Sequence, residues 1–143
     1  MILILDYRQA TSALLLADEK SVRRFSDTIG NGFRQLDEML NLIGPKADVQ
    51  GVAVVLADRT DDSAENKLTW STVRAAVSLA NSLAFAWGVP AVRIAPSVVE
   101  SELVERAKKF LSEANPSSRV SALYDGEPNI TKPKAAPSSN HQS

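Results

Sequence analysis

The densest group of carboxylates in the sequence lies in the polar segment 58–67, at Asp58, Asp61, Asp62 and Glu65. Carboxylates at this spacing could bind a divalent cation, because Ca²⁺ and Mg²⁺ prefer oxygen ligands. The EF-hand pattern is not met, since the segment has no glycine for the sharp turn and no regular alternation of ligands. Residues 58–73 contain no glycine at all, so a phosphate-binding loop is not expected either. We interpret the segment as a solvated acidic loop.

Side chains that act as bases or nucleophiles are scarce. The single histidine, His141, lies close to the C-terminal end, and the sequence has no cysteine. A histidine base, a histidine metal site and a thiolate site are therefore not expected. Asp6 ends an apolar run, where a functional carboxylate often lies in α/β proteins, but the bulky residues Tyr7–Gln9 follow it. We interpret Asp6 as structural, and we expect no enzymatic activity, no metal and no cofactor.

Length and charge narrow the class of protein further. The chain has 143 residues, of which 44% are hydrophobic and 23% charged, as expected for one globular domain. Its net charge of -1 lacks the basic footprint that strong direct binding of nucleic acid requires. The apolar start at Ile2–Leu5 is too short for a signal peptide or a membrane span. Together with the lack of cysteine, this predicts a cytoplasmic protein.

The hydrophobic pattern predicts alternating strands and helices. Three N-terminal strands with short links are expected to form an antiparallel meander, with the arginine-bearing third strand at an edge. A later apolar run lies between two helices, which is typical of parallel pairing. The expected strands are Ile2–Leu5, Ala13–Ala17, Val22–Phe25, Val52–Ala57 and Ala91–Ala95. The expected helices are Phe33–Ile43, Thr69–Trp87 and a third from Pro96 or Ser97 to Ala114.

Glycine and proline mark where two of these helices end. Gly44 with Pro45 follows the first helix, and Gly88 with Pro90 follows the second. A short apolar piece at Val120–Tyr124 could add a final strand. From Pro128 onward the composition cannot bury enough apolar surface to order itself. We expect a single lobe at residues 1–127 and a disordered tail at 128–143.

The first two helices are more apolar than a one-sided surface helix requires, because about half of the helical wheel or more is apolar in each. One interpretation is that the second helix is buried between the sheet and neighbouring helices. The other is that each helix covers the sheet with one flank and a partner protein with the other. The second interpretation draws its interface from a pool of residues: Phe33, Leu36, Met39, Leu40, Ile43, Trp70, Val73, Val77, Ala80, Ala84 and Trp87.

Three stretches of the sequence resemble one known family. Ile2–Asp6 followed by Thr11–Leu14 is similar to the family's start, "ILaiDTst…salsLal". Thr69–Arg74 with Ala84–Pro90 is similar to "SFTGlRig…akgLAlalgiP", and Leu123–Lys132 to "plYlRePdiTk". The family is TsaB (YeaZ), the non-catalytic subunit of the bacterial system that makes threonylcarbamoyladenosine in tRNA. The resemblance covers about residues 1–96 and 120–132.

The sequence also departs from this family. The family's "GPGSFTG" loop is replaced by the acidic segment without glycine, and its "DTST" is replaced by Asp6–Gln9. Between Pro96 and Leu123 there is room for one helix only, so most of the family's second lobe is expected to be missing. The resemblance implies a ribonuclease H-like lobe of the actin/Hsp70/sugar-kinase type. Such a lobe is an α/β fold with a five-stranded mixed sheet and helices on both faces.

The resemblance further implies a scaffold role in tRNA N6-threonylcarbamoyladenosine (t6A37) modification. The chain would pair with a TsaD-like catalytic subunit, joined by a TsaE-like ATPase, and would form a homodimer through its first two helices when alone. Two alternatives stay open. The chain could be a degenerate kinase-like or peptidase-like member of the superfamily, or a self-associating interaction protein with another partner.

Overall fold

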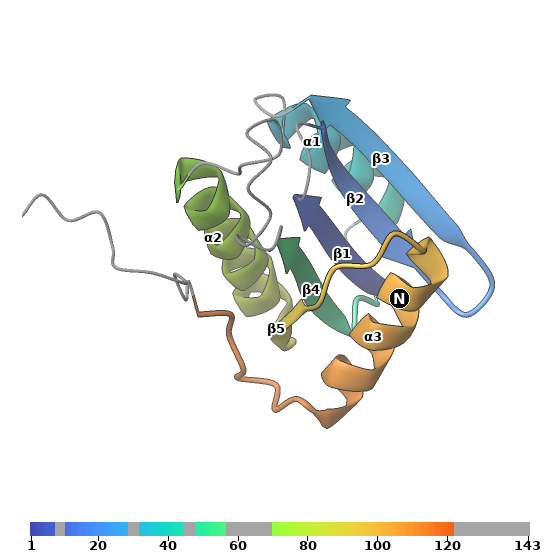
Figure 1. Ribbon diagram of the computed structural model, residues 1–143, viewed down its shortest axis with the longest axis vertical. Coiled ribbons are helices and arrows are strands. Elements are labelled where there is room, and N and C mark those ends of the chain that lie inside the picture. The colour runs from blue at the N-terminus through green and yellow to red at the C-terminus, as the bar shows by residue number, and fades with distance from the viewer. Residues whose placement is uncertain (8–10, 29–31, 45–47, 57–69, 122–143) are drawn as a thin grey trace, which may run out of the picture.

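A computed structural model describes residues 1–7, 11–28, 32–44, 48–56 and 70–121. Within these ranges the chain forms five strands and three helices around one sheet (Figure 1). The strands are β1 (Ile2–Tyr7), β2 (Thr11–Ala17), β3 (Val22–Thr28), β4 (Gly51–Leu56) and β5 (Ala91–Ile94). The helices are α1 (Gly32–Ile43), α2 (Trp70–Trp87) and α3 (Glu100–Glu113).

The sheet has the strand order β3-β2-β1-β4-β5. β1, β2 and β3 pair antiparallel, whereas β4 pairs parallel with β1 on one side and with β5 on the other. α1 and α2 pack on one face of the sheet, and α3 packs on the opposite face (Figure 1). The predicted meander, the parallel strand after α1 and the helices on both faces are therefore confirmed.

The two central strands, β1 and β4, explain this layering. Every residue of both strands is buried, so neither face of the sheet can stay in contact with water. Side chains alternate between the faces: Leu3 and Leu5 point toward α1 and α2, while Ile2 and Ile4 point toward α3. The continuous apolar runs in the sequence are the direct consequence of this two-sided burial.

β4 begins with a glycine, and the Leu111 side chain of α3 packs directly against it. A Cβ atom added to Gly51 would lie 2.5 Å from the nearest methyl carbon of Leu111, which is closer than carbon atoms can pack. Leu111 belongs to the cluster that covers the α3 face of the sheet. The absence of a side chain at position 51 thus leaves room for the Leu111 side chain against the sheet.

Several boundaries differ from the sequence-based expectation. β3 continues to Thr28 rather than ending at Phe25, because its backbone stays paired with β2 through polar positions such as Asp27 opposite Ser12. α3 begins at Glu100 rather than at Pro96 or Ser97, since the backbone at Val99 is extended.

The second helix ends as the sequence predicts. Gly88 has a positive φ of 66°, and the Val89 N–H donates to the Ala84 carbonyl at 2.9 Å, which closes the helix with a left-handed glycine. Four expectations fall wholly or largely outside the described residues: the cap at Thr69, the acidic loop 58–67, the strand at Val120–Tyr124 and the tail at 128–143. Of the expected strand, Val120 and Ser121 are described and are not in a strand.

The segment that follows α3 returns to the sheet edge and is fixed to α2. The Asn81 side chain accepts a hydrogen bond from the Val120 N–H at 2.8 Å and donates one to the Val120 carbonyl at 3.0 Å. The Ala91 N–H donates to the Ser118 carbonyl at 3.0 Å, which ties the same segment to β5. Asn81 therefore supplies the hydrogen bonds that a neighbouring strand would otherwise give.

In the described part of the chain, no helix combines the length and apolar character needed to cross a bilayer.

Replacing Asn81 by alanine tests this attachment. Asn81→Ala leaves both backbone groups of the buried Val120 without their partner, and we expect the free energy of unfolding to fall by about 1–3 kcal/mol. The neighbouring Ser82 is exposed and serves as the matched control, with Ser82→Ala expected to stay within about 0.5 kcal/mol of the wild type. Urea unfolding followed by circular dichroism measures both values. Equal stabilities for the two variants would contradict the attachment.

Candidate partner interface

The two helices that carry the predicted interface lie on the same face of the sheet. α1 covers β2 and β3, whereas α2 covers β4, β1 and β5 (Figure 1). Both contribute to one apolar cluster with the strands beneath them. Each helix therefore has a side that faces the sheet and a side that faces away from it, and the exposure of each residue tells the two apart.

The sheet-facing side takes up much of the predicted pool. Four of its residues are buried in the cluster with the strands: Met39, Val77, Ala80 and Ala84. Four more are partly buried and pack at the margins of that cluster: Leu36, Ile43, Val73 and Trp87. Leu40 is exposed, at 39% of its surface, and the side chains of Phe33 and Trp70 lie outside the described residues. Much of the extra apolar arc thus serves the core.

The outward side of α2 is formed mostly by small side chains. Ala75, Ser78, Ser82 and Ala86 are exposed along it. Phe85 lies beside them and has 79% of its surface exposed, the largest exposure of any described aromatic side chain. A phenylalanine in this position contributes nothing to the core and leaves a ring in contact with water. It is the side chain on this helix best suited to enter a partner's surface.

α1 exposes two leucines, one on each flank of its polar outer side. Leu40 and Leu42 have 39% and 47% of their surfaces exposed. Asp37 and Asn41 are also exposed, and the Asn41 amide lies 3.5 Å from the Asp37 carboxylate. The described outer surface is therefore a set of apolar anchors with polar neighbours, which is the composition of many non-obligate interfaces.

Phe85 and Leu42 were missed by the sequence-based pool, although the sequence contains a signal for each. At 100° per residue, Phe85 lies close to Ser78 and Ser82 on the helical wheel, within the polar side of α2. Leu42 lies near the polar Glu38 on the wheel of α1. An apolar residue within a polar arc indicates exposure, and the predicted pool includes neither Phe85 nor Leu42.

The carboxyl end of β1 is the other place where sequence reasoning considered a site. Asp6 is buried, with 6% of its surface exposed, and it has an interaction partner. Burial raises the pKa of the neighbouring Tyr7 above its ordinary value. Among the described residues, no group of three or more histidine, aspartate or glutamate side chains could hold a metal ion.

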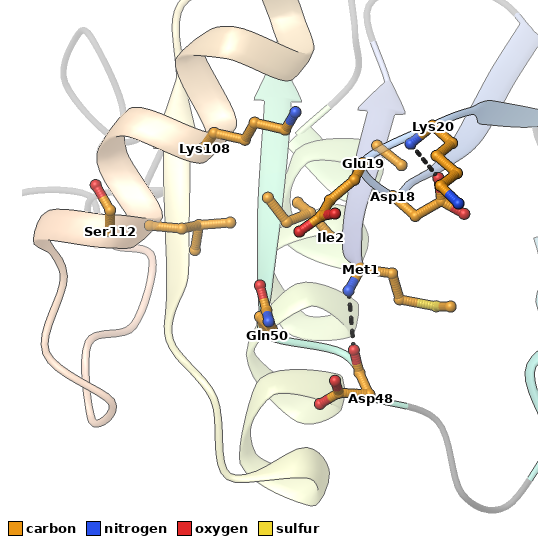
Figure 2. Close-up of a pocket in the computed structure, with 11 residues that line it drawn as sticks. Met1, Ile2, Asp18, Glu19, Lys20, Asp48, Gln50, Lys108 and Ser112 are labelled. Atoms are coloured by element: carbon orange, nitrogen blue, oxygen red, sulfur yellow. Dashed lines mark hydrogen bonds between the residues drawn. The ribbon is translucent and has the colours of Figure 1, made fainter.

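A hollow of about 720 Å³ lies at the opposite, amino end of β1 and β4 (Figure 2). Its lining combines the turn between β2 and β3 with the C-terminal half of α3, including Glu19, Lys20 and Lys108. The Asp18 carboxylate at its rim accepts hydrogen bonds from the Lys20 and Ser21 N–H groups, both at 2.7 Å, which lower the pKa of Asp18. Ligands of open α/β sheets usually bind at the carboxyl ends of the strands. The position and the exposed charges indicate a solvated hollow.

Comparison with known proteins identifies the fold. No protein-family model and no curated protein matches the chain. The structure of YeaZ from Pseudomonas aeruginosa matches with a TM-score of 0.51 and 16% sequence identity, covering 76% of this chain and 51% of the YeaZ chain. A structure described as a protein with similarity to peptidase YeaZ from Pseudomonas aeruginosa gives the same score, identity and coverage of this chain, and 49% coverage of its own.

The chain thus spans about half the length of these solved structures. At 16% identity the likeness establishes the fold alone. The fold is the single α/β lobe of the ribonuclease H-like, actin/Hsp70/sugar-kinase type that the resemblance in the sequence implied, and this expectation is confirmed.

The two sides of α2 can be distinguished by the same substitution. Val77→Asp places a charge against the sheet, and we expect it to cost about 4 kcal/mol or more and to unfold the protein. Phe85→Asp places the charge in water, and we expect its free energy of unfolding to stay within about 1 kcal/mol of the wild type. Circular dichroism with urea unfolding measures both. A folded Val77→Asp, or an unfolded Phe85→Asp, would contradict the assignment.

Proposed function

We propose that this chain is a non-catalytic, TsaB-like partner subunit in tRNA N6-threonylcarbamoyladenosine modification, and that it pairs with a TsaD-like catalytic subunit through the outer sides of α1 and α2. The observation that carries this proposal is Phe85, a phenylalanine with 79% of its surface in water on a helix of the matching lobe. In this proposal the partner provides the chemistry, and this chain provides a rigid surface.

The matched sequence stretches support the proposal through their position in the fold. Ile2–Asp6 forms most of the central strand β1, and Thr11–Leu14 forms the first half of β2. Ala84–Pro90 covers the end of α2 and its glycine-terminated turn, and it includes Phe85. The part of the sequence that most resembles the TsaB family therefore coincides with the part of the surface that offers the aromatic anchor.

The shape of α2 favours an interface with another helix or flat surface. Its outward side presents alanine and serine around Phe85, and small side chains let a second backbone approach closely. Buried aromatic anchors surrounded by small or polar residues commonly carry most of the free energy of an interface. Leu40 and Leu42 lie on opposite flanks of α1, so one of these exposed leucines would extend the contact.

Binding of the purified chain to a TsaD-like subunit tests the proposal. We expect a complex on size-exclusion chromatography with light scattering, and we expect Phe85→Asp to raise its dissociation constant about thirtyfold, the loss typical of a buried aromatic anchor. Phe110→Asp is the matched control, because Phe110 is 45% exposed but lies on α3, over the other face of the sheet. The control is expected to bind like the wild type.

Two outcomes would overturn the proposal. Failure of the wild-type chain to bind would remove the TsaD-like partner. Equal weakening by Phe85→Asp and Phe110→Asp would place the interface elsewhere. Calorimetric titration with ATP and Mg²⁺ separates the alternative of a degenerate nucleotide-binding enzyme, because a saturable isotherm for the isolated chain would favour that alternative.

A further inference from the structure

β3 is the outermost strand on one side of the sheet, and it is long for an edge strand. It spans seven residues, pairs only with β2 among the described strands, and lies at the margin of the molecule (Figure 1). Long edge strands offer a row of backbone donors and acceptors to another strand. Proteins that use such an edge for binding add an extended segment to their own sheet.

The hydrogen-bond pattern shows which backbone groups of β3 face outward. The Asp18 N–H donates to the Ser21 carbonyl at 3.0 Å, so this pair is of the hydrogen-bonded type in the antiparallel ladder. The type alternates along the ladder, and Arg23 opposite Leu16 is therefore hydrogen-bonded to β2. Positions 22, 24, 26 and 28 direct their N–H and C=O groups away from β2, toward the open edge.

The charged residues of β3 are complementary to those of a second β3 strand that runs antiparallel to it. Strand alternation puts positions 23, 25 and 27 on one face, and these residues are arginine, phenylalanine and aspartate. We propose that β3 pairs antiparallel with β3 of a second copy of this chain, about a two-fold axis at Phe25. In this register Arg23 of each copy lies opposite Asp27 of the other, and the two Phe25 residues lie opposite one another.

The outward backbone hydrogen bonds of β3 and the charges of its side chains both select this register. An axis at position 24 would place the two Arg24 residues opposite each other, and an axis at position 26 would leave Arg23 beyond the paired segment. An axis at Phe25 makes positions 24 and 26 of the two copies exchange their outward backbone hydrogen bonds. Backbone geometry and charge thus agree on a single arrangement.

The two arginines have different surroundings, which suits this arrangement. Arg24 lies on the α3 face, where its guanidinium already binds the Glu100 carboxylate through Nε at 3.1 Å and Nη2 at 3.0 Å. Arg23 lies on the α1 face, opposite Leu16, and is exposed with no ion-pair partner among the described residues. The second copy would give Arg23 a carboxylate, while Arg24 would keep the one it has.

Cysteine cross-linking tests the register directly, because the full chain has no cysteine of its own. A mixture of the Arg23→Cys and Asp27→Cys chains is expected to form the mixed disulfide dimer under mild oxidation. Either variant alone is expected to give at least about tenfold less dimer, since positions 23 and 27 of one copy do not face themselves in the other. Equal cross-linking in all three samples, or none in the mixture, would overturn the register.

Charge reversal tests the pairing without a covalent bond. The experiment uses the Phe85→Asp background, so that association through α1 and α2 does not contribute. In that background we expect sedimentation to detect a dimer, and Arg23→Asp or Asp27→Arg to weaken it about tenfold through two like-charge pairs. The double reversal R23D/D27R is expected to restore it. A monomeric Phe85→Asp chain, or a double reversal as weak as the single variants, would refute the pairing while leaving the TsaD-like partner untouched.

Discussion

The structure depends on the burial of β1 and β4 on both faces. Both central strands are buried along their full length, and a sheet with such a centre is stable only when each face is covered. α1 and α2 cover one face and α3 the other. Small residues lie where the helices contact the sheet, because both faces must be covered closely. Gly51 lets Leu111 reach the strand, and the fully buried Ala76, Ala80 and Ala84 let α2 lie close to the sheet.

Two-sided burial is also what made much of the fold predictable. The uninterrupted apolar runs of β1 and β4 predict central strands, and Gly44 and Gly88 predict the ends of α1 and α2. Features set by distant partners were not predictable. The extension of β3 comes from its pairing with β2, and the late start of α3 from the extended backbone at Val99. Asn81 lies among the polar residues of α2 on the helical wheel, and nothing local predicts its hydrogen bonds to Val120.

For the interface too, the local sequence pattern predicted some features, and the position of distant elements decided the others. Amphipathic patterns predicted that α1 and α2 would be more apolar than a one-sided helix, but they did not separate the residues that face the sheet from those that face water. Val77 and Ala80 are buried in the core, whereas Phe85, within a polar arc, has 79% of its surface exposed. The sheet's position fixes which flank is free, and the free flank of α2 carries Phe85, on which the proposed contact with a partner depends.

The central claim is that the outer sides of α1 and α2 receive a TsaD-like subunit. Hydrogen–deuterium exchange of the chain alone and mixed with that subunit tests it most directly. The account predicts slower exchange in peptides from Gly32–Ile43 and Trp70–Trp87, with no change across Glu100–Glu113 on the other face of the sheet. Protection of α3 alone, or of none of the three helices, would contradict this claim.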